Sequence, residues 1–358
     1  FGDAKVANCA SCHGFHDILP PEDPRSSVSP ERLSETCGGC HRQAKGNKKL
    51  GRIHVGAEAE SSKLQYYIKA IYILMIAGSI GGMLFYIGTD LFGFFVRRRR
   101  RGIGAREDGG HSADPNLPDN MDVERWPVGY RAQHFVLVFS FSVLVLTGMP
   151  LALPDFFLFK PITEVKWLYN MRGFVHRAAG FLMIAMCIYH VFYIITNRHA
   201  RKDILNMIPK PKDALDGLNS VLYNLTIKDE HPHMPRYNFI EKFEYLAMVW
   251  GSFVMVATGL VLTFNTPLLQ YLPKWAFDVA TLVHKFEAIL ATLSIIVWHI
   301  YTVHLCPDFF PMNRVFLTGK ISLRNLRKHH SEEYEELAGR LGEKLEEKEH
   351  DREQDETD

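Results

Sequence analysis

The sequence has almost no net charge, because 41 Lys and Arg residues offset 40 Asp and Glu residues among its 358 amino acids. A chain without a strong basic excess gives no reason to expect a nucleic-acid partner. Motifs typical of hydrolytic or nucleotide-dependent enzymes are also missing. The mean hydropathy is near zero, but it averages very apolar blocks with very charged ones.

Cysteine is scarce, with six residues in the whole chain. Four of them fall into two short motifs near the N-terminus, and Cys187 and Cys306 are single. A disulfide framework is therefore not expected. The chain starts at Phe1 without a signal peptide, so we expect a processed or incomplete chain.

Long apolar runs are what the sequence has in abundance. A bilayer crossing needs about 20 mostly apolar residues, and five segments meet this requirement: 66–96, 133–153, 173–196, 244–265 and 281–305. We expect an all-α membrane protein, with a four-helix transmembrane bundle, one N-terminal anchor helix and a small loop-rich segment before it. The expected boundaries are 1–62 (N-terminal segment), 63–101 (anchor helix), 102–129 (linker), 130–310 (four-helix bundle) and 311–358 (charged tail).

Five consecutive arginines, 97–101, follow the first apolar segment and mark its cytoplasmic end. The N-terminus would then lie outside and the C-terminus inside a bacterial cytoplasmic membrane crossed five times. Arg198, Arg201 and Lys202 after the third segment agree with this orientation.

Two Cys-x-x-Cys-His motifs predict covalently attached c-type haem in the N-terminal segment. Their cysteines would form the thioether bonds, and the adjacent histidines would bind iron: Cys9, Cys12 and His13; Cys37, Cys40 and His41. His16 and His54 are the other histidines before the first apolar run, and we expect them as distal ligands. A ligand exchange with a haem upstream of Phe1 is an open alternative.

Histidines recur at matched spacing inside the apolar segments. His176 and His190 are 14 residues apart, and His284 and His299 are 15 apart. Both spacings span roughly 21–22 Å of helix and return the second ring to within about 60° of the first. A weak internal repeat, with Thr-Gly at 147–148 and again at 258–259, precedes each pair. The pattern predicts two b haems, the outer one between His176 and His284 and the inner one between His190 and His299.

Neighbouring residues suggest further contacts with these haems. Arg177 and Lys285 directly follow the outer histidines and are candidates for pairing with haem propionates. Gly180, one turn from His176, would let a porphyrin approach the backbone. His134 lies at the same depth as the inner pair and competes with His190 for a ligand position.

The segment 125–335 resembles the bacterial di-haem cytochrome b family that serves formate dehydrogenases and hydrogenases. The resemblance rests on the run from His134 to Thr147-Gly148, on the His176 helix, and on His299-Ile300-Tyr301 followed by residues 307–313. It implies that the inner haem is held by His134 and His299. The spacing of His176 and His190 instead resembles the cytochrome b of bc-type complexes, in which the inner ligand would be His190. The internal repeat favours His190, and the N-terminal motifs resemble periplasmic multihaem cytochromes.

These features predict a membrane protein that passes electrons between the quinone pool and periplasmic haems or other redox subunits. Menaquinone or ubiquinone would be the substrate, and four residues are candidates for its site: Arg131, His134, Glu244 and Tyr245. The alternative is a haem-bearing anchor and relay subunit of a larger respiratory complex, without its own quinone site. His231 and His233 in a His-Pro-His loop are expected to be polar loop residues rather than metal ligands.

Overall fold

A computed structural model of the protein describes residues 9–13, 18–20, 22–40, 60–101, 118 and 121–340. The chain divides into two compact units, one of residues 1–76 with 252–290 and the other of residues 77–251 with 291–358. Each unit is described below by itself. His16, His41 and His54 lie outside the described residues.

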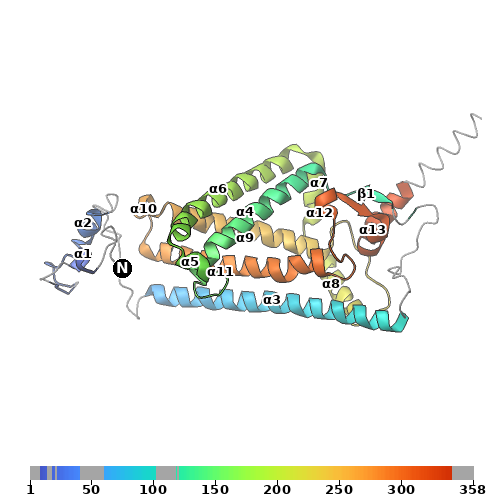
Figure 1. Ribbon diagram of the computed structural model, residues 1–358, viewed down its shortest axis with the longest axis horizontal. Coiled ribbons are helices and arrows are strands. Elements are labelled where there is room, and N and C mark those ends of the chain that lie inside the picture. Colours follow the sequence, from blue (N-terminus) through green and yellow to red (C-terminus); the bar gives the residue numbers. More distant parts are fainter. Residues whose placement is uncertain are drawn as a thin grey trace, which may run out of the picture. The chain divides into compact units, whose positions relative to one another are not determined.

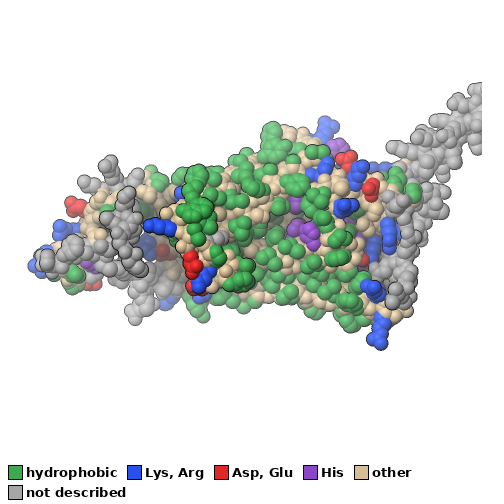
Figure 2. All heavy atoms as spheres, in the orientation of Figure 1, with side chains coloured by type: hydrophobic (Ala, Val, Ile, Leu, Met, Phe, Trp, Pro, Cys, Tyr) green, Lys and Arg blue, Asp and Glu red, His purple; other side chains and the backbone are tan. Residues whose placement is uncertain are grey.

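Five helices in the described ranges are long and apolar enough to cross a membrane. They are α3 (Glu60–Arg101), α4 (Val128–Ala152), α6 (Lys166–Thr196), α9 (Phe239–Thr263) and α11 (Lys274–Ser294), the last continued by π-helical segments η2 (Ile295–His299) and η3 (Tyr301–Leu305). Hydrophobic side chains dominate the face of these helices that is drawn in Figure 2. Apolar surface of this extent is costly in water but not in lipid. The prediction of a helical membrane protein with five spans is confirmed at this level.

Shorter elements connect the spans: α1 (Cys9–His13), α2 (Leu33–Gly38), α5 (Lys160–Glu164), α7 (Arg198–Met207), α8 (Pro211–Asn224), α10 (Asn265–Leu268), α12 (Val315–Thr318) and α13 (Leu323–His329). Helix α7 starts after Asn197, whose side chain accepts hydrogen bonds from the backbone N–H groups of His199 and Ala200. Strands β1 (Asp122–Glu124) and β2 (Lys320–Ser322) pair antiparallel, with Val123 opposite Ile321. This ribbon departs from the expectation of an all-helical chain.

Helices α4 and α6 lie side by side in the second unit (Figure 1). Ser140 on α4 is fully buried, and its hydroxyl contacts the sulfur of Met183 on α6 at 3.7 Å. Ala179 is buried on the same helix as Met183. Small residues at such an interface let two membrane helices approach closely, and this pairing positions the histidines of α6 against α4.

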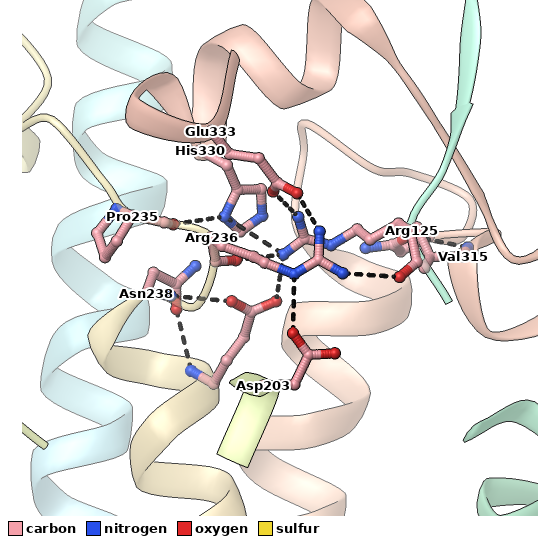
Figure 3. A network of polar contacts seen from close by, with 10 residues as sticks. Arg125, Asp203, Pro235, Arg236, Asn238, Val315, His330 and Glu333 are labelled. Atoms are coloured by element: carbon pink, nitrogen blue, oxygen red, sulfur yellow. Dashed lines mark hydrogen bonds and ion pairs between the residues drawn. The ribbon is translucent and has the colours of Figure 1, made fainter. Parts of the chain in front are cut away.

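The second unit also has a compact cap built from segments far apart in the sequence. Its core consists of Val315, Ile321, Leu323, Leu326 and Tyr334. Beside this core, Figure 3 shows the guanidinium groups of Arg125 and Arg236 converging on Glu333. Arg125, whose side chain is 3% exposed, also donates to the carbonyl oxygen of Arg236 at 2.5 Å and pairs with Glu241 at 3.3 Å. The network fixes the starts of α4 and α9 against the segment after α13.

Candidate functional site

Thr147 and Thr258 each contact a histidine of the following long helix. In the second unit, Oγ1 of Thr147 on α4 lies 2.9 Å from Nδ1 of His176 on α6. In the first unit, Oγ1 of Thr258 on α9 lies 2.9 Å from Nδ1 of His284 on α11. The two halves of the internal repeat thus build the same contact independently, which the sequence alone did not reveal.

The remaining contacts of each threonine fix the proton positions. Thr147 Oγ1 is 2.6 Å from the carbonyl oxygen of Val143, and Thr258 Oγ1 is 2.7 Å from that of Val254. Because a carbonyl oxygen only accepts, each hydroxyl donates to it, and the hydroxyl oxygen accepts from the histidine Nδ1–H. Each histidine is therefore held in the tautomer with its lone pair on Nε2, the atom suited to bind a metal.

The glycines after these threonines make room for the rings. A Cβ atom on Gly148 would lie 3.1 Å from Cε1 of His176, and one on Gly259 would lie 3.4 Å from Cε1 of His284. A larger residue at position 148 would press on the imidazole, so the Thr-Gly pair both orients and accommodates its histidine.

His134 and His299 approach each other within the second unit. Their ring centroids are 6.3 Å apart and the rings are tilted by 50°. Nδ1 of His134 is buried and has no hydrogen-bond partner in the described part of the chain. Trp126 and Phe316 surround the His134 ring, each at a centroid distance of 5.7 Å.

Glu244 and the π-helical segments position His299. A carboxylate oxygen of Glu244 lies 3.4 Å from Nδ1 of His299, so this histidine too can direct Nε2 away from its orienting partner. His299 ends η2, where the N–H of Ile300 bonds the carbonyl of Ile295, five residues earlier. A π turn holds more residues than an α turn and often marks a functional site. The spacing from His284 to His299 is one residue longer than the spacing from His176 to His190. The π turn before His299 accommodates this extra residue.

Both ring nitrogens of His190 are occupied. Nδ1 lies 2.7 Å from Oε1 of Gln133, and Nε2 lies 3.1 Å from the hydroxyl of Tyr245. The amide Nε2 of Gln133 donates to the carbonyl of Gly129 at 3.1 Å, which fixes the amide orientation. His190 therefore donates from Nδ1 to Gln133 and accepts from Tyr245.

The residues near the outer histidines that were predicted to contact haem are Gly180, Arg177 and Lys285. A Cβ atom on Gly180 would meet no described atom within 4 Å, so open space adjoins this position. Arg177 and Lys285 are exposed. Arg172, which sequence reasoning missed, lies one turn before His176 and donates to the carbonyl oxygen of Thr147 at 3.0 Å. Its position four residues before His176 was the available signal.

The N-terminal thiols lie in the first unit on α1 and around the end of α2. Cys12, Cys37 and Cys40 are free thiols. Burial, with smaller contributions from Cys12 and Cys40, raises the pKa of the Cys37 thiol. The hydroxyl of Ser27 donates to the carbonyl oxygen of Cys12 at 2.5 Å, which holds α1 near the segment before α2.

Arg131 and the two loop histidines have local partners. Arg131 donates to the carbonyl oxygen of Leu317 at 2.8 Å. Burial lowers the pKa of His231 to about 3, and His233 lies 3.6 Å from a carboxylate oxygen of Glu335. Within the described ranges, no cluster of three or more His, Cys, Asp or Glu side chains could hold a metal ion.

Comparison with known proteins identifies the family of the chain. Residues 125–306, just over half of the chain, match the family model described as prokaryotic cytochrome b561. The cytochrome b556(Fdn) subunit of the nitrate-inducible formate dehydrogenase of Escherichia coli is 24% identical over 215 residues, which are 58% of this chain and 88% of that protein. The Azospira oryzae protein named "Putative protein-methionine-sulfoxide reductase subunit YedZ1" is 28% identical over 188 residues, which are 51% of this chain and 90% of that protein.

The five long apolar helices and the histidines on them define a membrane cytochrome of the b type. The chain belongs to the prokaryotic cytochrome b561 family. Membership implies haem of the b type and a role in electron transfer. The matched region begins at Arg125 and therefore leaves out α3 and the N-terminal segment.

The residues present fit a b haem. With metal–nitrogen bonds of about 2 Å and ring centres about 1.2 Å beyond the nitrogen, imidazoles on opposite sides of one iron have centroids roughly 6–6.5 Å apart. The 6.3 Å between His134 and His299 agrees with that value. The Thr–His contacts at positions 176 and 284 supply the hydrogen-bonded Nδ1 that metal-binding histidines almost always have.

Proposed function

We propose that the protein carries electrons across the bacterial cytoplasmic membrane between the quinone pool and redox partners outside, through two b haems. The observation that carries this proposal is the repeated Thr–His contact, because it orients Nε2 of two histidines for iron in the two halves of a repeat. The haem would supply one-electron chemistry, and the protein would orient it and set its potential.

The outer b haem would be bound by His176 and His284. The sequence spacing and the shared threonine contact support this pairing. Open space beside Gly180 would admit the porphyrin. Arg177 and Lys285 remain candidates for the propionates, and Arg172 joins them because it lies beside Thr147.

The inner b haem would be bound by His134 and His299 rather than by His190 and His299. Two observations support this choice: the ring separation, and the use of both His190 nitrogens by Gln133 and Tyr245. Glu244 would orient His299. Binding iron through His190 would require the Tyr245 contact to break.

The quinone would bind on the arginine-rich side of the membrane, next to the inner haem. Of the four candidate residues, Tyr245 is best placed, because its hydroxyl contacts His190 rather than a proposed ligand. His190 joins it as a hydrogen-bonding group. Arg131 and Glu244 would act indirectly, through residues 317–319 and through His299.

The N-terminal segment would carry two covalent c haems on the outer side. The support is the pair of Cys-x-x-Cys-His motifs, together with the five arginines that follow α3 and favour a cytoplasmic end there. His16 and His54 stay as candidate distal ligands. Electrons would then pass between these haems and the b haems.

A second possibility is an anchor and relay subunit without its own quinone chemistry. The observation favouring it is that both relatives are named as subunits, one of a formate dehydrogenase and one of a protein-methionine-sulfoxide reductase. A catalytic subunit of a respiratory complex would then be the partner. Reduction of the haems by a soluble quinol in the isolated protein would contradict this possibility.

Methionine substitutions test the ligand assignment, with the content of low-spin b haem as the measurement. We expect His176→Met and His284→Met each to lose the same haem, and His134→Met and His299→Met to lose the other. His190→Met should keep both, as should the control His199→Met on α7. Loss of a haem in His190→Met with both retained in His134→Met would contradict the inner assignment.

A further inference from the structure

Helix α3 brings an acidic side chain to membrane depth against the π-helical segment. The hydroxyl of Tyr301 in η3 donates to Oδ2 of Asp90 on α3 at 2.5 Å. The family match begins only at residue 125, so Asp90 lies outside the matched region. Ionisable residues within membrane spans are costly to bury and usually have a function.

A polar face of α8 lies next to α3. Asp216, Ser220 and Asn224 are spaced by four residues, which places them on one side of the helix, and each is at most 5% exposed. Helix α3 contacts this region closely: Arg97 donates to the carbonyl oxygen of Tyr223 at 3.1 Å. A Cβ atom on Gly93 would lie 2.4 Å from the carbonyl oxygen of Asn224.

On and beside this face, four buried polar atoms lack a hydrogen bond of standard geometry to any described residue: Oδ2 of Asp216, Oγ of Ser220, Nδ2 of Asn224, and Nε1 of Trp298 in η2. The hydroxyl of Tyr86 on α3 interacts with the side chains of Ser220 and Asn224 without completing such a bond. The Tyr86 ring lies edge-on to Trp298, at a centroid distance of 5.4 Å. Buried polar groups that the protein leaves unsatisfied are commonly bonded by ordered water.

We propose that this face of α8 is a water-filled proton path that ends at Asp90, and that Asp90 takes up and releases a proton as the inner b haem is reduced and oxidised. The inference rests on the proposed b haem at His299, which is two residues from Tyr301. The path would run from Asp216 past Ser220 and Asn224 to Tyr86 and Asp90.

The charge balance is simple. One electron arriving at the inner haem, from the quinol or from the donor outside, adds one negative charge. One proton from water on the arginine-rich side then converts the Asp90 carboxylate to the neutral acid. When the electron leaves for a quinone, Asp90 returns the proton. Among the described residues, the titratable groups that face Asp90 and also modulate its charge are Tyr86, Arg97, Tyr301, Cys306, Asp308 and His329.

The test uses the full-length holoprotein in lipid nanodiscs and follows the midpoint potential of each b haem against pH. In the wild type, we expect the inner haem potential to fall as pH rises. Asp90→Asn, which can still accept from Tyr301, should abolish most of this dependence, and Asp90→Glu should retain it. The control Asp278→Asn in the first unit should behave as the wild type. The dependence surviving in Asp90→Asn would overturn the proposal.

Two further measurements remain decisive if Asp90→Asn does not fold. Redox-difference infrared spectra of the wild type should show a carboxylic acid band that shifts in D₂O, and a spectrum without it would overturn the proposal. In Ser220→Val, proton uptake after stopped-flow reduction should be several-fold slower, while the inner haem potential should still fall as pH rises. An unchanged rate of proton uptake would show that α8 is not part of the path. Failure of the proposed function itself would look different, because no b haem would be present.

Discussion

Replacing Thr147 or Thr258 with valine tests how the outer histidines are oriented. Each threonine hydroxyl accepts from a histidine Nδ1–H at 2.9 Å, and valine keeps the shape while removing the acceptor. An acceptor on Nδ1 makes Nε2 more basic, which favours the ferric state. Its loss should therefore raise the reduction potential of the haem.

The size of the shift follows from the value of one hydrogen bond. A net contribution of about 1 kcal/mol that acts mainly on the ferric state corresponds to ~40 mV for a one-electron couple, at about 59 mV per tenfold change in equilibrium constant. A redox titration followed in the visible absorption of the b haems resolves a shift of this size.

The double variant tests the pairing of the two histidines. If His176 and His284 bind one haem, Thr147→Val and Thr258→Val should each raise the potential of the same haem, and the double variant should raise it by about the sum. Thr281→Val is the matched control, because Thr281 lies on α11 and, among the described residues, its hydroxyl bonds the carbonyl oxygen of Phe277 in its own helix. Unchanged or lowered potentials in both single variants would refute the reasoning, and shifts of two different haems would refute the pairing.

Three other substitutions have clear expected outcomes. Gly148→Val should lower the content of the outer haem, because even a Cβ atom would lie 3.1 Å from the His176 ring; full haem content would contradict the close approach. Arg125→Met should lower the free energy of unfolding by about 1–3 kcal/mol in a denaturant titration, because it removes the hydrogen bonds of Arg125 to Glu333 and to the carbonyl oxygen of Arg236, while Glu333 keeps its pairing with Arg236; an unchanged midpoint would contradict a stabilising role. The pKa of His231, lowered by burial to about 3, means that the unfolded chain binds more protons between about pH 6.5 and 3. Stability should therefore fall as pH drops through this range, and His231→Asn should lessen the fall in thermal denaturation scans; an identical fall would exclude His231 as its source.

The apolar spans were predictable because lipid demands long runs of apolar residues whatever the packing. The ends of these spans were less predictable from the sequence. Helix α6 starts at Lys166 rather than at residue 173, and α11 starts at Lys274 rather than at residue 281, because helices continue into the interface with polar residues. The β1–β2 ribbon joins residues about 200 positions apart and has only three residues in each strand, which is too short to give a pattern.

The site was visible in the sequence as spaced histidines, but the groups that orient them were not. The Thr-Gly pairs could be recognised as a repeat, whereas their contact with histidine depends on how α4 and α9 pack. The choice between His134 and His190 illustrates the same limit. Both lie at a suitable depth in the sequence, and only the positions of Gln133, Tyr245 and His299 distinguish their surroundings.

The most direct test of this account is a count of haems in the purified full-length protein, by pyridine haemochrome together with a reduced-minus-oxidised spectrum. The account predicts two b haems with low-spin, bis-histidine spectra and two c haems that stay attached in acidified acetone. A colourless protein, or one that holds only covalently attached haem, would contradict it.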